Sequence, residues 1–162
     1  MKSNIQKPDV ETLTVAQRGA ELLVVVAMVL LFSFFADHQL THTGFLSTKF
    51  GVVEMFCLYG PIPVSLVAPL VKVFTGRRNP ARPFEAATNL SLAIGSFWLR
   101  IVFPFNFAHL ADVLPGALRF AISWITNDIG KILLMLPVIV GPIVALLVTL
   151  KYFSIRRQTS AA

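Results

Sequence analysis

Long apolar runs alternate with short polar stretches along most of the chain. Residues 22–36 are interrupted only by Ser33, and similar runs follow further along the sequence. A helix needs about 20 mainly apolar residues to cross the hydrocarbon core of a bilayer. The pattern therefore predicts an all-α, polytopic integral membrane protein. Its four transmembrane helices are expected at about 20–36, 50–74, 85–103 and 131–150.

The stretch between the third and fourth predicted spans holds too few apolar residues to cross a bilayer. Residues 117–125 are apolar apart from Arg119 and Ser123, and they lie between a proline-glycine pair and a polar segment. Trp124 suits the headgroup level, where indole rings concentrate. We expect an interfacial or re-entrant helix here.

The polar ends of the chain divide it into three regions. Residues 1–19 are expected to form a cytoplasmic arm, 20–153 the transmembrane domain and 154–162 a cytoplasmic tail. A cleaved signal peptide is the alternative for the first span. It fits less well, because Asp9 and Glu11 precede the apolar run and no small-residue cleavage site precedes Asp37.

Basic residues are distributed unequally between the two sides of the four-span arrangement. Between the second and third spans lies a polar stretch, residues 76–85, which we call the hinge. One side carries the larger group: Lys2, Lys7, Arg18, Lys72, Arg77, Arg78, Arg82, Lys151, Arg156 and Arg157. The other side carries Lys49, Arg119 and Lys131. Because cytoplasmic loops are enriched in Lys and Arg, both termini and the hinge are predicted to be cytoplasmic, in the plasma membrane.

Composition agrees with a lipid environment. Of the 162 residues, 56% are hydrophobic, and the mean hydropathy is +0.74. The net charge of +6 comes from clusters between apolar runs and not from one continuous face, so nucleic acid is not the expected partner. The single cysteine, Cys57, excludes an intrachain disulfide.

Three prolines interrupt the second predicted span. Each removes a backbone donor and frees the carbonyl four residues earlier, so the helix is expected to bend or break. The candidate residues of this broken span are Cys57, Tyr59, Pro61, Pro63 and Ser65. Discontinuous helices of this kind bind ions or substrates in transporters.

Glu54 and Arg100 are the charges least expected inside spans. Both fall near the outer ends of adjacent spans, so a rise of about 1.5 Å per residue places them at similar depth. A short hinge should make the two helices an antiparallel hairpin, which predicts an ion pair between them. The alternative is that each side chain reaches the nearby interface by itself.

Histidines and acids gather on the predicted outer side. His38 and His42 are four residues apart, and His109 and Asp112 are three apart. Imidazole and carboxylate ligands at helical spacing suit zinc, iron or copper, which makes these four residues a candidate metal site. The alternative is that they are ordinary polar loop residues.

The hinge arginines Arg77, Arg78 and Arg82 lie beside the membrane, where each basic group is attracted to anionic lipid headgroups. They are therefore expected either to bind anionic lipid or to act only as a topology signal.

No nucleophile motif, phosphate loop or catalytic carboxylate pair occurs in the sequence, so we expect a non-catalytic protein without a cofactor. Ala87, Ser91 and Gly95 recur every four residues, which lets another helix approach closely, either within the chain or from a partner. The preferred interpretation is a subunit or scaffold of a membrane complex, with a membrane-protein partner or a second copy of the chain. The alternative is an oligomeric ion or small-solute transporter built around the broken second span.

Overall fold

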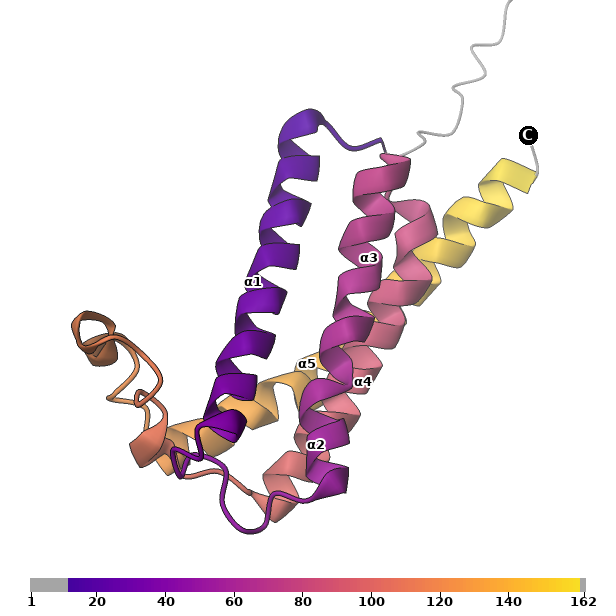
Figure 1. Cartoon of the computed structure of the whole chain (residues 1–162). Helices are drawn as coiled ribbons and strands as arrows, with labels where there is room; N and C mark the ends of the chain where they lie inside the picture. Colours follow the sequence, from indigo (N-terminus) through magenta and orange to yellow (C-terminus); the bar gives the residue numbers. More distant parts are fainter. Residues whose placement is uncertain (1–11, 161–162) are drawn as a thin grey trace, which may run out of the picture.

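The computed structural model describes residues 12–160. Helices are the regular secondary structure in that range, joined by turns and loops, with two isolated β-bridges and no strand. Figure 1 shows the elements as a bundle of long helices with an irregular segment at one end. The α-helices are α1 (Val15–Leu40), α2 (Val52–Tyr59), α3 (Pro61–Thr75), α4 (Arg82–Val102) and α5 (Asn127–Ser160). Short 3-10 helices are η1 (Asn79–Ala81), η2 (Phe107–His109) and η3 (Gly116–Ala121).

Helix α1 begins earlier than the apolar run that predicted it. Thr14 caps it: the Gln17 backbone N–H donates to Thr14 Oγ1 at 3.3 Å, and the Thr14 N–H donates to the Gln17 side chain at 3.0 Å. This reciprocal cap satisfies backbone donors that a helix start leaves unpaired. Part of the predicted arm, 15–19, therefore belongs to the first helix, and residues 1–11 lie outside the described residues.

Helices α2 and α3 follow one another with only Gly60 between them. Gly60 has φ −56° and ψ −43°, which are helical values, so the two helices together form one 24-residue span. Gly76 ends α3 in the left-handed region at φ 65°, where glycine carries no steric penalty. The Leu13 N–H donates to the Gly76 carbonyl at 2.8 Å, which ties the start of α1 to the hinge.

Helix α4 lies in the middle of the bundle, where it packs against α5, α3 and α2. Pro83 stands in its first turn, where a missing N–H costs nothing. The helix ends at Val102, and the next residue, Phe103, takes a left-handed conformation (φ 42°) directly before Pro104. Figure 1 shows α4 running alongside α3 over most of its length.

Three helices are long and apolar enough to cross a membrane: Val15–Leu40, Val52–Thr75 and Asn127–Gln158. Helix α4 is not among them, although it has 21 residues. Its sequence carries polar residues throughout, including Asn89, Ser96 and Arg100, which lower its hydropathy.

The segment after α4 does not form one α-helix. Where an interfacial or re-entrant helix was expected, residues 103–126 form turns and the short helices η2 and η3. It folds onto an aromatic core made by Phe45, Leu99, Phe105 and Leu110, which are all buried. In Figure 1 this orange segment lies beside the far end of α1.

Helix α5 continues further than predicted. It runs for 34 residues, passes through Pro137 and Pro142, and includes most of the expected cytoplasmic tail. Residues 161–162 lie outside the described part of the chain. Gly141 lets α5 approach α4, because a Cβ there would lie 2.7 Å from the Asn89 carbonyl oxygen and 3.0 Å from the Ala93 Cβ.

Candidate functional site

An ion-paired cluster lies at the hinge end of the bundle. Lys72 Nζ on α3 lies 2.9 Å from Glu21 Oε1 on α1 and 2.6 Å from Glu85 Oε1 on α4. Exposure of the Lys72 side chain is 16%, and that of the two carboxylate side chains is 20% and 26%. One cation therefore joins three helices, and partial burial makes these ion pairs stronger than exposed ones.

A cavity of about 320 Å³ opens beside this cluster. We call it the hinge cavity, and it is lined by Glu21, Lys72, Arg78, Arg82, Glu85, Leu147, Val148 and Lys151. Charged side chains form most of its wall, and two aliphatic side chains of α5 form the rest. Such a lining suits a polar, charged group with an apolar portion.

The three hinge arginines occupy different environments. Arg82 is buried, with 5% of its surface exposed, and its Nη1 donates to Asn79 Oδ1 at 3.1 Å. Arg78 is exposed and lines the hinge cavity. Arg77 is also exposed, but it is not part of the cavity wall and forms an isolated backbone bridge with Thr12. The arginines are thus not equivalent.

Glu54 has hydrogen-bond partners other than Arg100. Its Oε1 accepts from the Trp98 indole Nε1 at 2.9 Å, and its Oε2 accepts from the Gly51 backbone N–H at 2.9 Å. No ion pair joins it to Arg100 in the described part of the chain, and Arg100 Nε is buried without a hydrogen-bond partner there. The structure therefore brings Glu54 to Trp98 and not to Arg100.

A double-mutant cycle should detect the Glu54–Trp98 hydrogen bond. We expect the effects of Glu54→Gln and Trp98→Phe on stability to be coupled by about 1 to 2 kcal/mol. Either change removes the hydrogen bond to the charged acceptor, so the double variant loses nothing more from that bond than a single variant does. Thermal unfolding in detergent measures this coupling. The matched cycle of Glu54→Gln with Arg100→Gln should be additive within about 0.5 kcal/mol. Stronger coupling of Glu54 to Arg100 than to Trp98 would contradict this assignment.

The proline-containing span is packed and not widely broken. Pro61 deprives the Cys57 carbonyl of its helical donor, and Gly95 of α4 packs directly against that carbonyl. Ser65 is buried, and its hydroxyl donates to the Ile62 carbonyl at 2.6 Å. A break near Gly60 is therefore covered by α4 and does not open a polar path.

An apolar groove of about 540 Å³ lies between α1 and the α2–α3 span. It is lined by Phe32, Ala36, Gln39, Leu40, Met55, Phe56, Tyr59, Gly60 and Pro63. The buried Tyr59 hydroxyl has no hydrogen-bond partner among the described residues. Of the predicted broken-span residues, Tyr59 and Pro63 border this groove.

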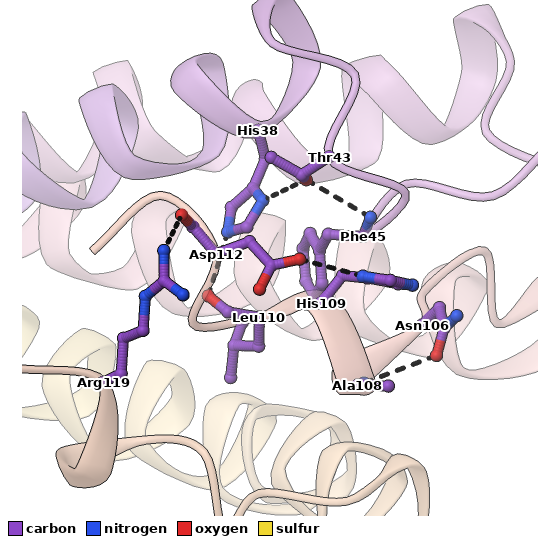
Figure 2. Close-up of polar contacts among 9 residues, drawn as sticks. All are labelled: His38, Thr43, Phe45, Asn106, Ala108, His109, Leu110, Asp112 and Arg119. Carbon is purple, nitrogen blue, oxygen red and sulfur yellow. Dashed lines mark hydrogen bonds and ion pairs between the residues drawn. The ribbon is translucent and has the colours of Figure 1, made fainter. Parts of the chain in front are cut away.

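His38 anchors the far end of α1 to the segment after α4 (Figure 2). It is 1% exposed, its Nε2 donates to the Leu110 carbonyl at 3.0 Å, and its Nδ1 lies 2.6 Å from Thr43 Oγ1. The Phe45 N–H donates to the same hydroxyl at 3.4 Å, so that hydroxyl can donate its proton to Nδ1. Because Nε2 donates to a carbonyl, His38 is the tautomer protonated there, and both ring nitrogens are used.

Removing the His38 hydrogen bonds should loosen this end of the protein. We expect His38→Phe to lower the free energy of unfolding by about 1 to 2 kcal/mol, because it leaves the Leu110 carbonyl and the Thr43 hydroxyl unsatisfied. Thermal unfolding in detergent measures the loss. The control is His109→Phe, whose exposed partner Asp112 can turn to water; it should change stability by less than about 0.5 kcal/mol. Equal losses in both variants would contradict the anchoring role.

The four candidate metal ligands do not come together as one site. His109 Nδ1 lies 2.9 Å from Asp112 Oδ2, and Arg119 donates to the Asp112 backbone carbonyl at 3.2 Å (Figure 2). His38 has no nitrogen left for a metal, and His42 takes a left-handed backbone conformation in the turn after α1. Within residues 12–160, no three His, Cys, Asp or Glu side chains are placed to hold a metal ion. The spacing of His109 and Asp112 instead reflects a structural hydrogen bond between them.

The Lys72 cluster and the Glu54–Trp98 bond are the contacts that sequence analysis missed. A signal for the first was available, because Glu21 is the one acid in the first predicted span, Lys72 lies just before the hinge and Glu85 is the last hinge residue. A comparison of all charged residues predicted to lie at this depth would have suggested that Lys72 pairs with the two acids.

Comparison with known protein families, with curated proteins and with solved structures found no match to this chain.

Proposed function

We propose that this chain is a small, non-catalytic, four-span membrane protein that serves as a subunit or scaffold of a membrane complex. The observation that supports this most is the packing of α1. Among the described residues, this 26-residue helix packs chiefly against α3, and large apolar side chains along it are exposed, such as Leu23, Leu30 and Phe32. A span held on one side presents the rest of its surface to lipid or to a partner helix.

Helix α4 is the proposed fourth span. Its 21 residues extend about 31 Å, which is the thickness of the hydrocarbon core. Its polar groups face its neighbours: Thr88 Oγ1 donates to the Val64 carbonyl of α3 at 3.2 Å, and Ser96 is buried. A helix enclosed by other spans can carry such groups at membrane depth. The segment 103–126 then lies at the outer interface.

The basic residues orient this arrangement with the hinge and both termini in the cytoplasm of a plasma membrane. Accessibility of single cysteines in intact cells tests it. In a Cys57→Ser background, Thr48→Cys, at an exposed position of the loop after α1, should react with a membrane-impermeant maleimide from outside, and Asn79→Cys should react only after the cells are opened. Labelling of Asn79→Cys in intact cells would reverse the orientation.

Purification in mild detergent followed by native mass spectrometry tests the subunit role. We expect either a foreign membrane protein at fixed stoichiometry or a defined homo-oligomer. A photo-crosslinker placed at Leu30 on the exposed face of α1 should give one discrete adduct with the same partner. A crosslinker at the buried Ala68 of α3 is the matched control and should give none. A monomer without an adduct at Leu30 would contradict the proposal.

The second candidate is an oligomeric ion or small-solute transporter. The groove beside Tyr59, whose hydroxyl is buried without a partner, favours it. The mainly apolar lining of that groove favours it less than a polar path would. A homo-oligomer that makes liposomes permeable to small ions would support the transporter over the scaffold.

A further inference from the structure

The residues that line the hinge cavity come from the hinge and from the four longest helices. Glu21 comes from α1, Lys72 from α3, Arg78 from the hinge, Arg82 from the start of α4 and Lys151 from α5. In Figure 1 the beginning of α1, the end of α3 and the beginning of α4 meet at the upper end of the bundle. A ligand bound here would therefore contact all the helices that must stay together.

Positive charge exceeds negative charge in the wall of this cavity. Four basic side chains line it together with two carboxylates, and both carboxylates are bound to Lys72. Arg78, Arg82 and Lys151 also line the wall, and Arg82 is buried. With four basic side chains and two carboxylates, the wall carries a net positive charge that attracts an anion.

The donor set suits a phosphate group. Guanidinium groups bind phosphate oxygens through two parallel N–H donors, and lysine adds a point charge. Helix α4 begins at Arg82, so the positive end of its dipole lies at the same place. An anion in the cavity would thus be held by side chains and favoured by the helix.

The apolar part of the wall indicates the source of that phosphate. Leu147 and Val148 of α5 border the cavity, and they continue the apolar surface of that span. A charged group beside aliphatic side chains at the end of a span is the arrangement of a lipid headgroup joined to its acyl chains. A small, freely soluble phosphate compound without an apolar portion would make no favourable contact with this apolar wall.

We propose that the hinge cavity binds the phosphate headgroup of an anionic membrane lipid and thereby holds α1, α3, α4 and α5 together. This inference rests on the proposed function only in placing the hinge at a leaflet surface. Binding itself depends on the side chains, so it can be measured in micelles whatever the orientation or partner of the protein.

Lipid titration of the purified full chain tests the proposal. Phosphatidylglycerol is added to detergent micelles, and the midpoint of thermal unfolding and the number of retained lipids in native mass spectra are followed. Phosphatidylglycerol should raise the midpoint and remain bound, and phosphatidylcholine should do so much less. Arg78→Gln and Lys151→Gln should each weaken phosphatidylglycerol binding about fivefold, as expected for loss of one basic group.

Arg77→Gln is the matched control, because it removes the same charge from the same hinge but lies outside the cavity wall. It should leave the affinity within about twofold of the unchanged protein, since only screened, longer-range attraction is lost. Both Arg78 and Lys151 are exposed, so their replacement should leave the fold intact. Equal weakening by the Arg77 and Arg78 variants, or equal binding of the two lipids, would overturn the proposal.

Glycerol 3-phosphate distinguishes the two sources of phosphate. If it neither stabilises the protein nor displaces phosphatidylglycerol, the lipid assignment is supported. If it does both, in the wild-type chain but not in Arg78→Gln, the lipid assignment is overturned in favour of a soluble phosphate compound. A failed cysteine orientation test or the absence of a protein partner would refute the proposed function and leave these binding results unchanged.

Discussion

Replacing Lys72 with methionine is expected to destabilise the protein by about 3 kcal/mol, the lower end of the range for breaking a buried ion pair. The loss arises because Glu21 and Glu85 would remain mostly buried and close to one cavity without their shared cation. Methionine keeps most of the side-chain volume, so the effect reports charge and not packing. The measurement is the free energy or midpoint of unfolding in detergent.

Compensating changes make this prediction specific. Adding Glu21→Gln and Glu85→Gln to Lys72→Met should recover much of the lost stability, because no uncompensated charge would remain in the cluster. Glu21→Gln alone should cost less than Lys72→Met, since Lys72 keeps Glu85 at 2.6 Å. If the triple variant were no more stable than Lys72→Met, the ion pairs would not be the source of the effect.

Gly95→Val is expected to cost about 3 kcal/mol through overpacking between α4 and the α2–α3 span. A Cβ at Gly95 would lie 2.5 Å from the Cys57 carbonyl oxygen and 3.4 Å from Pro61 Cγ. The first contact is with backbone, which cannot turn aside as a flexible side chain can. Helix α4 would have to move away from the proline-containing span. Thermal unfolding in detergent again provides the measurement.

Gly19→Val is the matched control, because a Cβ at this helical position in α1 meets nothing within 4 Å. Its effect should be small and could be stabilising, since glycine is a poor helix former. A loss at Gly19 as large as that at Gly95 would show that the effect comes from valine in a helix and not from close approach of two helices.

Much of the helical framework could be predicted from sequence. The lengths of the apolar runs indicated α1, the α2–α3 span and α5, because crossing a bilayer is a local requirement on length and polarity. The small-residue stripe was informative only in part: Gly95 packs within the chain, which is one of the two alternatives given for the stripe, but Ala87 is exposed. The ends of α1 and α5 were misplaced, since capping at Thr14 and helix continuation beyond the apolar run do not depend on hydropathy.

The segment 103–126 shows why irregular structure was harder to predict. Its apolar residues suggested a single helix, but Pro104, Pro115 and Gly116 favour turns, and the aromatic core supplies the stabilising contacts. Phe45 is far along the chain from Phe105 and Leu110, so its burial with them follows from tertiary packing.

The sequence by itself determined which stretches suit lipid and where the basic hinge lies, because both depend on the composition of short segments. Only the tertiary structure decided which charged groups meet. Depth in the membrane follows from residue number, and depth suggested Glu54 with Arg100. The direction in which each helix faces its neighbour does not follow from residue number. Trp98 and Arg100 are separated by about 200° around the axis of α4, so one neighbouring carboxylate can reach only one of them. Packing turns Trp98 toward Glu54. The ion pair between Lys72 and Glu21 was not predicted for the same reason. The two residues are 51 positions apart, and they meet only once α1, α3 and α4 have packed.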